Sequence, residues 1–238
     1  MDWFSATKPL IIGHRGASAD ATENTLAAFH LAREQGAEGV ELDVQLSADG
    51  WPVVMHDEAV DRTTSGQGQV GALKLADLKA LTVADGQQIP TLAEVFEELG
   101  PDFLYNVELK DYGVRDSGLA TAVSACVRQF GFHKQVLASS FSPLTARRAR
   151  HSLAPETGVG LIRYQEHMKA GHWLFKAAAD HPHYSLVDAA YIEWAKAHSL
   201  RIHVWTVDDP AEAQRLLDLG VHGLITNKPG FLRTQLGL

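Results

Sequence analysis

Short apolar runs alternate with longer amphipathic runs from one end of the chain to the other. The apolar runs read as strands at residues 9–13, 39–45, 103–109, 136–140, 158–162, 178–183, 201–206 and 222–225. The amphipathic runs read as helices at 24–36, 91–99, 116–130, 143–150, 166–176, 188–198, 210–219 and 229–236. Eight such alternations in 238 residues predict an α/β fold, a single (β/α)8 TIM barrel. A doubly wound open sheet is the alternative.

Length and charge limit what such a chain can bind. We expect residues 1–238 to form one domain, because a barrel of this class typically needs about 250 residues. Hydrophobic residues make up 45% of the chain, which is enough for a sizeable core. The net charge of −8 argues against a basic face for nucleic acid or for an anionic membrane. An anionic ligand would have to meet local positive charge or a bound cation.

The sequence also limits the cellular compartment and the type of metal site. Cys126 is the only cysteine, so neither an intrachain disulfide nor a thiolate metal cluster can form. The first residues do not read as a signal peptide, and no apolar run approaches the ~20 residues of a membrane span. We therefore expect a cytoplasmic protein without stable membrane insertion. The sequence does not predict an oligomeric state.

One connection is much longer than the others and covers residues 46–90, after the second strand. Asp49-Gly50 between two apolar runs predicts a hairpin, followed by a turn-rich cap over one end of the barrel. If the turn centres on residues 49–50, Leu46 faces Val53 and Asp43 faces His56. A slip of one residue would turn these side chains to the other face of the hairpin.

Candidate site residues follow several of the predicted strands. His14 and Arg15 come directly after the first strand, where barrel enzymes place catalytic groups. Gly13 and Gly16 flank them and would let the backbone approach a ligand closely. A turn carrying a surface histidine is the alternative. His56 stands beside the acidic pair of the second strand if the hairpin register holds, and is otherwise an exposed hairpin histidine.

Acidic residues recur at alternate positions near the ends of two strands. Glu41 and Asp43 share one face of the second strand, and Glu108 and Lys110 share one face of the third. Three carboxylates at neighbouring strand ends form a hard oxygen-donor site, which suits one Mg²⁺ or Ca²⁺ ion and, less well, Mn²⁺. Ion pairs with arginine or lysine are the alternative use of these carboxylates.

The ordered motifs together resemble the glycerophosphodiester phosphodiesterase family, in its small single-domain bacterial form. They are His-Arg-Gly at 14–16, Glu-Asn-Thr at 23–25, Glu-x-Asp at 41–43, His-Asp at 56–57, Glu-x-Lys at 108–110, Trp-Thr-Val at 205–207 and Thr-Asn-Lys-Pro at 226–229. Two positions depart from the family pattern. Thr22 replaces a frequent proline, which would affect a helix N-terminus. Asp208 replaces the usual asparagine, which would affect substrate preference.

The resemblance implies a role for each matched residue. His14 and His56 would be the general acid and base, and Glu41, Asp43 and Glu108 would hold one divalent cation. The phosphate-binding residues would be Arg15 and Lys110, and the wall for the glycerol end would be Trp205. His183 and Phe141, near the ends of other strands, are further candidates for lining the pocket.

The implied reaction cleaves a glycerophosphodiester into an alcohol and glycerol 3-phosphate. One histidine would accept the proton of the nucleophile and the other would protonate the leaving oxygen. The nucleophile is either water or the 2-hydroxyl of the substrate. Two other functions stay open on the residues alone. One is a metal-dependent barrel lyase or isomerase, and the other is a catalytically silent barrel that only binds.

Overall fold

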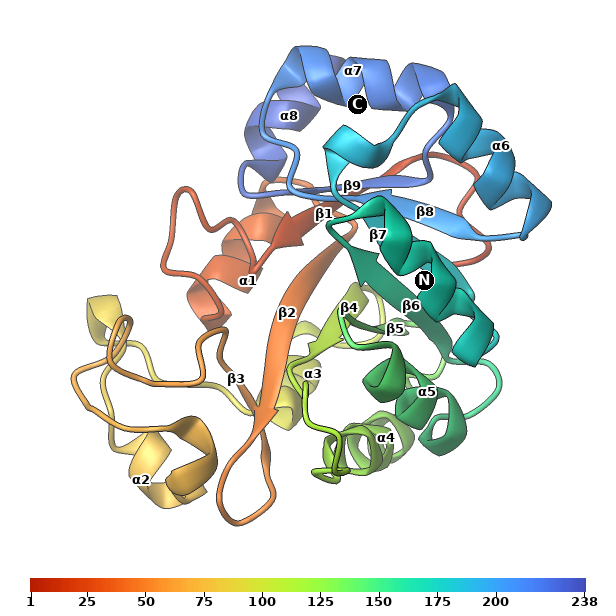
Figure 1. Ribbon diagram of the computed structural model, residues 1–238. Helices are drawn as coiled ribbons and strands as arrows, with labels where there is room; N and C mark the ends of the chain where they lie inside the picture. Colours follow the sequence, from red (N-terminus) through yellow and green to blue (C-terminus); the bar gives the residue numbers. More distant parts are fainter.

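Eight parallel strands close into a barrel. The computed structural model describes residues 1–238. The barrel strands are β1 Leu10–His14, β2 Gly39–Leu46, β4 Leu104–Leu109, β5 Val136–Ser140, β6 Gly158–Arg163, β7 Ala179–Pro182, β8 Arg201–Val204 and β9 Gly223–Thr226. Each pairs in parallel with its neighbours, and β1 pairs with both β2 and β9, which closes the ring. The predicted (β/α)8 barrel is confirmed (Figure 1).

Helices surround the barrel in the order expected of alternating strand–helix units (Figure 1). They are α1 Leu26–Glu34, α3 Leu92–Leu99, α4 Leu119–Phe130, α5 Pro143–Ser152, α6 Ala189–Ala197, α7 Pro210–Leu219 and α8 Pro229–Leu236. The unit after β6 differs from the prediction, because Glu166–Leu174 is a 3-10 helix, η3, and not an α-helix. Only Gly171 of this segment is buried, so it lacks the apolar stripe that stabilises an amphipathic α-helix by packing.

Alternating side chains of the strands build separate layers of the core. Ile11 packs outward against the helices of the C-terminal half, whereas Leu10 and Ile12 point into the barrel. Trp3 joins this inner cluster, is fully buried and donates a hydrogen bond from Nε1 to the carbonyl oxygen of Gln135 at 2.7 Å. The segment before β1 therefore fills the interior of the barrel with a large aromatic side chain.

Side-chain caps fix where several helices begin. Thr91 forms a capping box with Glu94 at the start of α3, and Asp209 accepts a hydrogen bond from the Glu212 N–H at the start of α7. The cap of α1 is Thr25, which accepts from the Ala28 N–H at 3.2 Å. Thr22 is therefore not the cap of this helix. Its carbonyl oxygen accepts a hydrogen bond from the hydroxyl of Thr25, so its effect on the helix start is indirect.

The long connection after β2 begins with the predicted hairpin, but in a different register. Strand β3, Pro52–Val54, pairs antiparallel with β2, and the partners are Leu46↔Pro52, Gln45↔Val53 and Val44↔Val54. The predicted pairs of Leu46 with Val53 and of Asp43 with His56 are therefore wrong by one residue. The physical reason is a turn that is shorter by one residue: residues 47–51 connect Leu46 to its partner Pro52, whereas the predicted pairing of Leu46 with Val53 needs residues 47–52.

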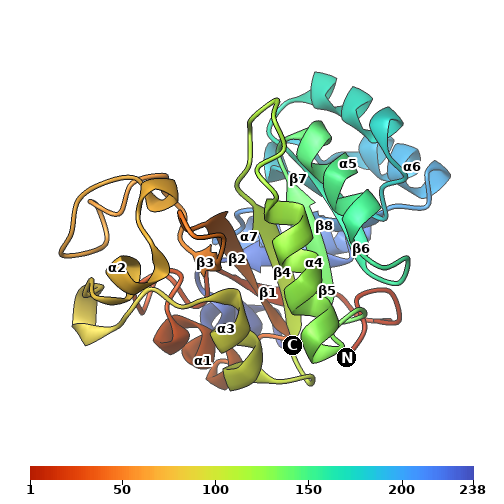
Figure 2. The same cartoon turned by 90° about the horizontal axis from the view of Figure 1, so that it is seen from below.

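The rest of the connection has structure of its own. It contains the short helices η1 Val70–Ala72, α2 Leu75–Lys79 and η2 Ala84–Gly86. A separate apolar cluster holds it together, formed by Val53, Met55, Val60, Val70, Leu78, Val83 and Ile89. In both ribbon views this segment, coloured orange to yellow, lies beside the barrel and not within the ring of helices (Figures 1 and 2).

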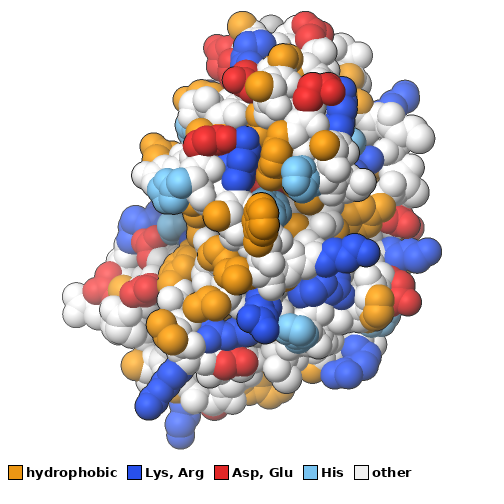
Figure 3. All heavy atoms as spheres, turned by 45° about the vertical axis from the view of Figure 1, so that its right-hand side comes forward, with side chains coloured by type: hydrophobic (Ala, Val, Ile, Leu, Met, Phe, Trp, Pro, Cys, Tyr) orange, Lys and Arg blue, Asp and Glu red, His pale blue; other side chains and the backbone are white.

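The outer surface carries mixed side chains. Apolar side chains gather near the centre of the face in Figure 3, and positive, negative and histidine side chains are interspersed around them. Exposed apolar residues follow β5, β6 and β7 in the chain and include Leu144, Tyr164, Trp173 and Tyr184. None of the helices is both long and apolar enough to cross a bilayer.

Candidate active site

Three carboxylates meet near the C-terminal ends of β2 and β4. The two strands pair in parallel with Asp43 opposite Glu108, and Glu41 lies two residues before Asp43 on the same face. One oxygen from each of Glu41, Asp43 and Glu108 lies within 4.8 Å of the others, and all three residues are buried. The structure thus brings together the three carboxylates that the strand pattern predicted for one site.

Two basic side chains pair mainly with Asp43. Lys110 Nζ lies 3.3 Å from Asp43 Oδ1 and 3.1 Å from Glu108 Oε1, and Arg15 Nε lies 3.3 Å from Asp43 Oδ2. Burial alone would raise the pKa of Asp43, but the charges of Lys110 and Arg15 outweigh it and lower that pKa. The ion pairs considered as an alternative use of the carboxylates are therefore present.

Lys110 and Arg15 do not balance the charge of the other two carboxylates, Glu41 and Glu108. Burial and the charges of Asp43 and Glu108 hold the pKa of Glu41 well above its usual value. Burial and the charge of Asp43 raise the pKa of Glu108 to about 7, despite its contact with Lys110. Three carboxylates against two cations leave negative charge that a proton or a bound cation must balance.

Arg15 has a strained backbone next to the site. Its φ is 55°, in the left-handed region that costs a non-glycine residue energy. This conformation points the Arg15 N–H at Glu41 Oε2, 3.0 Å away, while the guanidinium reaches Asp43 and Glu23. A strained arginine that contacts two carboxylates of one cluster is typical of a functional site and not of a simple turn.

Gly13 and Gly16 serve the fold. A Cβ on Gly16 would lie 2.6 Å from the Ala28 backbone, and one on Gly13 would lie 2.9 Å from the Gly16 carbonyl oxygen. Both glycines therefore allow the loop after β1 to pack against its own turn and against α1. The close packing therefore accounts for both glycines, and their expected role in a ligand's approach to the backbone stays a prediction.

The two predicted histidines line the same pocket as Glu41 and Glu108. His14 Nε2 is 3.9 Å from Glu41 Oε2, and His14 Nδ1 is 2.7 Å from Asn227 Oδ1. Burial, with a smaller contribution from the Arg15 charge, lowers the pKa of His14, which favours the neutral ring. His56 Nδ1 lies 2.6 Å from Asp57 Oδ1, and Arg62 holds that carboxylate in place through Oδ2 at 2.5 Å.

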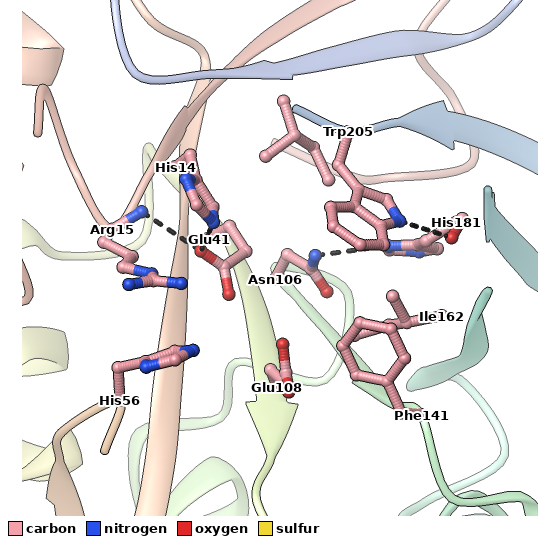
Figure 4. Close-up of a pocket in the computed structure, with 11 residues that line it drawn as sticks. His14, Arg15, Glu41, His56, Asn106, Glu108, Phe141, Ile162, His181 and Trp205 are labelled. Atoms are coloured by element: carbon pink, nitrogen blue, oxygen red, sulfur yellow. Dashed lines mark hydrogen bonds and ion pairs between the residues drawn. The ribbon is translucent and has the colours of Figure 1, made fainter. Parts of the chain in front are cut away.

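A cavity of about 110 Å³ joins these groups to an apolar wall. Its polar side carries His14, Arg15, Glu41, His56 and Glu108, and its apolar side carries Phe141, Ile162, Trp205 and Ile225. The ring centroids of Phe141 and Trp205 lie 5.5 Å apart, edge to face. Figure 4 shows His14, Arg15 and His56 on one side of the cavity and Trp205, Phe141 and Ile162 on the other. One pocket therefore offers separate polar and apolar surfaces to a single ligand.

Residues 14–231 match the Glycerophosphoryl diester phosphodiesterase family. The chain belongs to this family. It is accordingly an enzyme, a phosphoric diester hydrolase. The glycerophosphodiester phosphodiesterase of Caldanaerobacter subterraneus subsp. tengcongensis is 38% identical over 232 residues, which cover 93% of this chain and 95% of that relative.

Solved structures of similar proteins have the same fold. A phosphodiesterase of Oleispira antarctica, solved in complex with its product sn-glycerol-3-phosphate, is 30% identical with a TM-score of 0.85, and the match covers 97% of this chain and 98% of that one. The glycerophosphodiester phosphodiesterase of Thermotoga maritima is also 30% identical, with a TM-score of 0.76 and coverage of 96% and 99%.

Several polar residues of the site were not singled out from the sequence. Asn106 and His181 line the pocket of the enzyme, and Asn106 Nδ2 donates to His181 Nδ1 at 3.2 Å. Burial lowers the pKa of His181 to about 4, so this ring is neutral at ordinary pH. Strand periodicity could have found Asn106, because it lies two residues before Glu108 and shares its face.

Other missed residues contact the predicted ones from distant segments. Asn24 Nδ2 donates to Asp43 Oδ2 at 2.8 Å, and the Tyr112 hydroxyl donates to Glu108 Oε1 at 3.1 Å. Of the two further candidates, Phe141 lines the pocket, whereas His183 does not line it but is half-buried against Trp205, with ring centroids 5.4 Å apart. Asn24 and Asn227 both belong to the motifs that carried the family resemblance, although no role was predicted for either residue.

Proposed function

We propose that the enzyme hydrolyses glycerophosphodiesters to an alcohol and sn-glycerol 3-phosphate with the help of one bound divalent cation. The observation that carries the proposal is the buried cluster of Glu41, Asp43 and Glu108 in a pocket that also holds two histidines. The family match and the product-bound Oleispira antarctica relative support the choice of substrate.

The donor set fits a hard divalent cation. Glu41, Asp43 and Glu108 offer only carboxylate oxygens, which is the chemistry that Mg²⁺ and Ca²⁺ prefer. The raised pKa of Glu41 and of Glu108 indicates that the nearby charges of Arg15 and Lys110 do not fully offset burial and the repulsion between the carboxylates. These three residues would hold the cation, which when bound would stabilise the negative charge that builds up on the phosphoryl oxygens.

The residues around the carboxylates would place the two ends of the substrate. Arg15 and Lys110 lie beside the cluster and would bind the phosphate oxygens, an anion that matches their charge. The apolar face of Trp205 would contact the glycerol carbons, since its indole N–H is already bonded to the His181 carbonyl oxygen at 2.8 Å. The substrate phosphate would then lie between the polar and apolar sides of the pocket.

His14 and His56 would carry the protons of the reaction. One ring accepts the proton of the attacking hydroxyl, either water or the 2-hydroxyl of the glycerol, as the new P–O bond forms. The other ring donates a proton to the leaving alcohol oxygen as the old P–O bond breaks. Attack by the 2-hydroxyl gives a cyclic phosphate, and water opens that ring in a second step with the roles reversed. The ring that gave up its proton would then accept one from water, and the other ring would return its proton to the 2-oxygen as that P–O bond breaks.

Product identification tests this function. The enzyme would be incubated with glycerophosphocholine, and ³¹P NMR would follow the phosphorus-containing product. We expect sn-glycerol 3-phosphate and free choline from the wild-type enzyme, and release slower by at least about 100-fold from the His14→Ala variant. The matched control is His151→Ala, which changes an exposed histidine at the end of α5. Formation of phosphocholine and glycerol, or no cleavage by the wild type, would refute the proposed reaction.

A further inference from the structure

A chain of hydrogen bonds leads from His14 away from the pocket. His14 Nδ1 lies 2.7 Å from Asn227 Oδ1, and Asn227 Nδ2 lies 2.6 Å from Asp208 Oδ2. The other carboxylate oxygen, Asp208 Oδ1, accepts the backbone N–H of Asn227 and the hydroxyl of Thr226, each at 2.8 Å. Asn227 lies after β9 and Asp208 precedes α7, so two neighbouring strand–helix connections meet behind the His14 ring.

The donors and acceptors of this chain can be assigned from chemistry. An ionised carboxylate only accepts hydrogen bonds, so Asp208 requires the N–H₂ group of Asn227 on its side. The amide oxygen of Asn227 must then face His14, where it also accepts the Ser18 hydroxyl at 2.8 Å. An amide oxygen cannot donate, and the short contact to His14 Nδ1 is therefore made by a hydrogen on that nitrogen.

We infer that Asp208 and Asn227 are positioning residues that fix the His14 ring with a hydrogen on Nδ1 and with Nε2 toward the carboxylate cluster. This inference rests on the proposed function and assigns its proton transfers. Because Nδ1 is held as a hydrogen-bond donor to Asn227, Nε2 is the nitrogen left to exchange a proton with the substrate, and it makes His14 the base that takes the proton of the attacking hydroxyl. The departure at residue 208 thus concerns the orientation of a catalytic group, whereas the sequence pointed to substrate preference.

The surroundings of His56 suit the opposite role. Its Nδ1 faces Asp57 Oδ1 at 2.6 Å, so a carboxylate stands behind this ring where an amide oxygen stands behind His14. Arg62 bonds Asp57 Oδ2 at 2.5 Å and keeps this carboxylate turned toward the ring. With His14 as the base, His56 is left as the acid that protonates the leaving oxygen. The two histidines thus differ in the group that faces Nδ1, which is the amide oxygen of Asn227 for His14 and the carboxylate of Asp57 for His56.

Exchanging the two positioning residues gives a sharp test. In Asp208→Asn, the new amide N–H₂ would face the N–H₂ of Asn227, and the mismatch would turn the Asn227 amide and move the His14 hydrogen to Nε2. In Asn227→Asp, two carboxylates would face each other. In the double variant, the new amide at 208 would donate to the new carboxylate at 227, which would again accept from His14 Nδ1. Hydrogen-bond matching therefore predicts that the exchange rescues both single variants.

Kinetics and NMR would be measured on the same preparations of the full chain. We expect kcat to fall about 10–100-fold in each single variant, with KM changed less than about threefold, and to return to within about fivefold of wild type in the double variant. The matched control is Asp209→Asn, the adjacent residue, whose side chain only caps α7. Asparagine is an equally good helix cap, so this control should keep wild-type kcat.

The NMR measurement reads the tautomer without turnover. Uniform ¹⁵N labelling of the 12 histidines, with His14→Gln to assign the His14 signals, would show which ring nitrogen carries the hydrogen at pH 8. We expect the Nδ1–H form in the wild type and the Nε2–H form in Asp208→Asn. An Nε2–H ring in the wild type, unchanged kcat in Asp208→Asn, or a double variant no faster than either single variant would each overturn the inference. Failure to release sn-glycerol 3-phosphate would instead refute the proposed function. The ¹⁵N signals of the histidine rings are recorded without substrate and therefore test the inference separately.

Discussion

Replacing Glu108 with glutamine should change how the stability of the metal-free enzyme depends on pH. Glu108 is buried beside Asp43, and its pKa is raised from 4.5 to about 7 in the folded chain. A carboxyl group with a raised folded-state pKa binds its proton more tightly in the folded than in the unfolded state. It therefore stabilises the fold fully below pH 4.5, and this contribution is lost as the pH rises through 7.

The size of the effect follows from that difference in pKa. A change from 4.5 to about 7 corresponds to roughly 3 kcal/mol at high pH, at about 1.4 kcal/mol per pKa unit. Between pH 5 and pH 8, the wild type should lose about 2 kcal/mol more unfolding free energy than Glu108→Gln. The variant also loses the Lys110 contact at 3.1 Å, which shifts its stability at both pH values. The difference between the two pH values is for that reason the informative quantity.

Urea unfolding with EDTA at pH 5 and at pH 8 measures this quantity. Glu97→Gln is the matched control, because Glu97 is exposed on α3 and should follow the wild type. Saturating Mg²⁺ or Ca²⁺ should raise the unfolding free energy of the wild type at pH 8, because a cation that binds the folded state stabilises it. The increase should be much smaller in Glu108→Gln, which lacks one of the three carboxylates. Equal pH dependence in the wild type and in Glu108→Gln would refute the view that this carboxylate is left undercompensated.

The remaining predictions concern the pocket. His14→Ala and His56→Ala should each lower kcat by roughly 10²–10⁴-fold with little change in the urea midpoint, and near wild-type kcat in either variant would remove that histidine from the reaction. Glycerophosphocholine, glycerophosphoethanolamine and glycerophosphoglycerol should have kcat/KM values within about tenfold of each other, because the apolar wall faces the glycerol end that they share. Trp205→Ala should lower kcat/KM for all three by a similar factor, and selective loss of one head group would mean that Trp205 contacts the alcohol instead.

Local patterns in the sequence predicted the parts of the enzyme that depend on one strand or on neighbouring strands. The alternation of strands and helices favours a parallel α/β fold, because parallel strands need helical crossovers, and the eight repeats favour the barrel over the doubly wound sheet. The period of two residues along a strand places Glu41 with Asp43, and the order of the strands brings Glu108 beside them. The family resemblance added His56, which the wrong hairpin register could not have placed.

Contacts between distant segments were beyond such patterns. The bond between His14 and Asn227 spans 213 residues and exists only because β9 closes the barrel against β1. The hairpin register depended on the length of one turn, and a single residue changed every pair. An amphipathic pattern predicted an α-helix at 166–176, but the close packing of Gly171 in the observed 3-10 helix is a property of the tertiary structure.

The central claim is that Glu41, Asp43 and Glu108 hold one divalent cation that the reaction requires. The most direct measurement is the rate of sn-glycerol 3-phosphate release from glycerophosphocholine by EDTA-treated, desalted enzyme, titrated with Mg²⁺ or Ca²⁺. We predict no turnover before metal is added and saturable recovery afterwards, with a single class of site. Full turnover by exhaustively metal-free enzyme would contradict the claim.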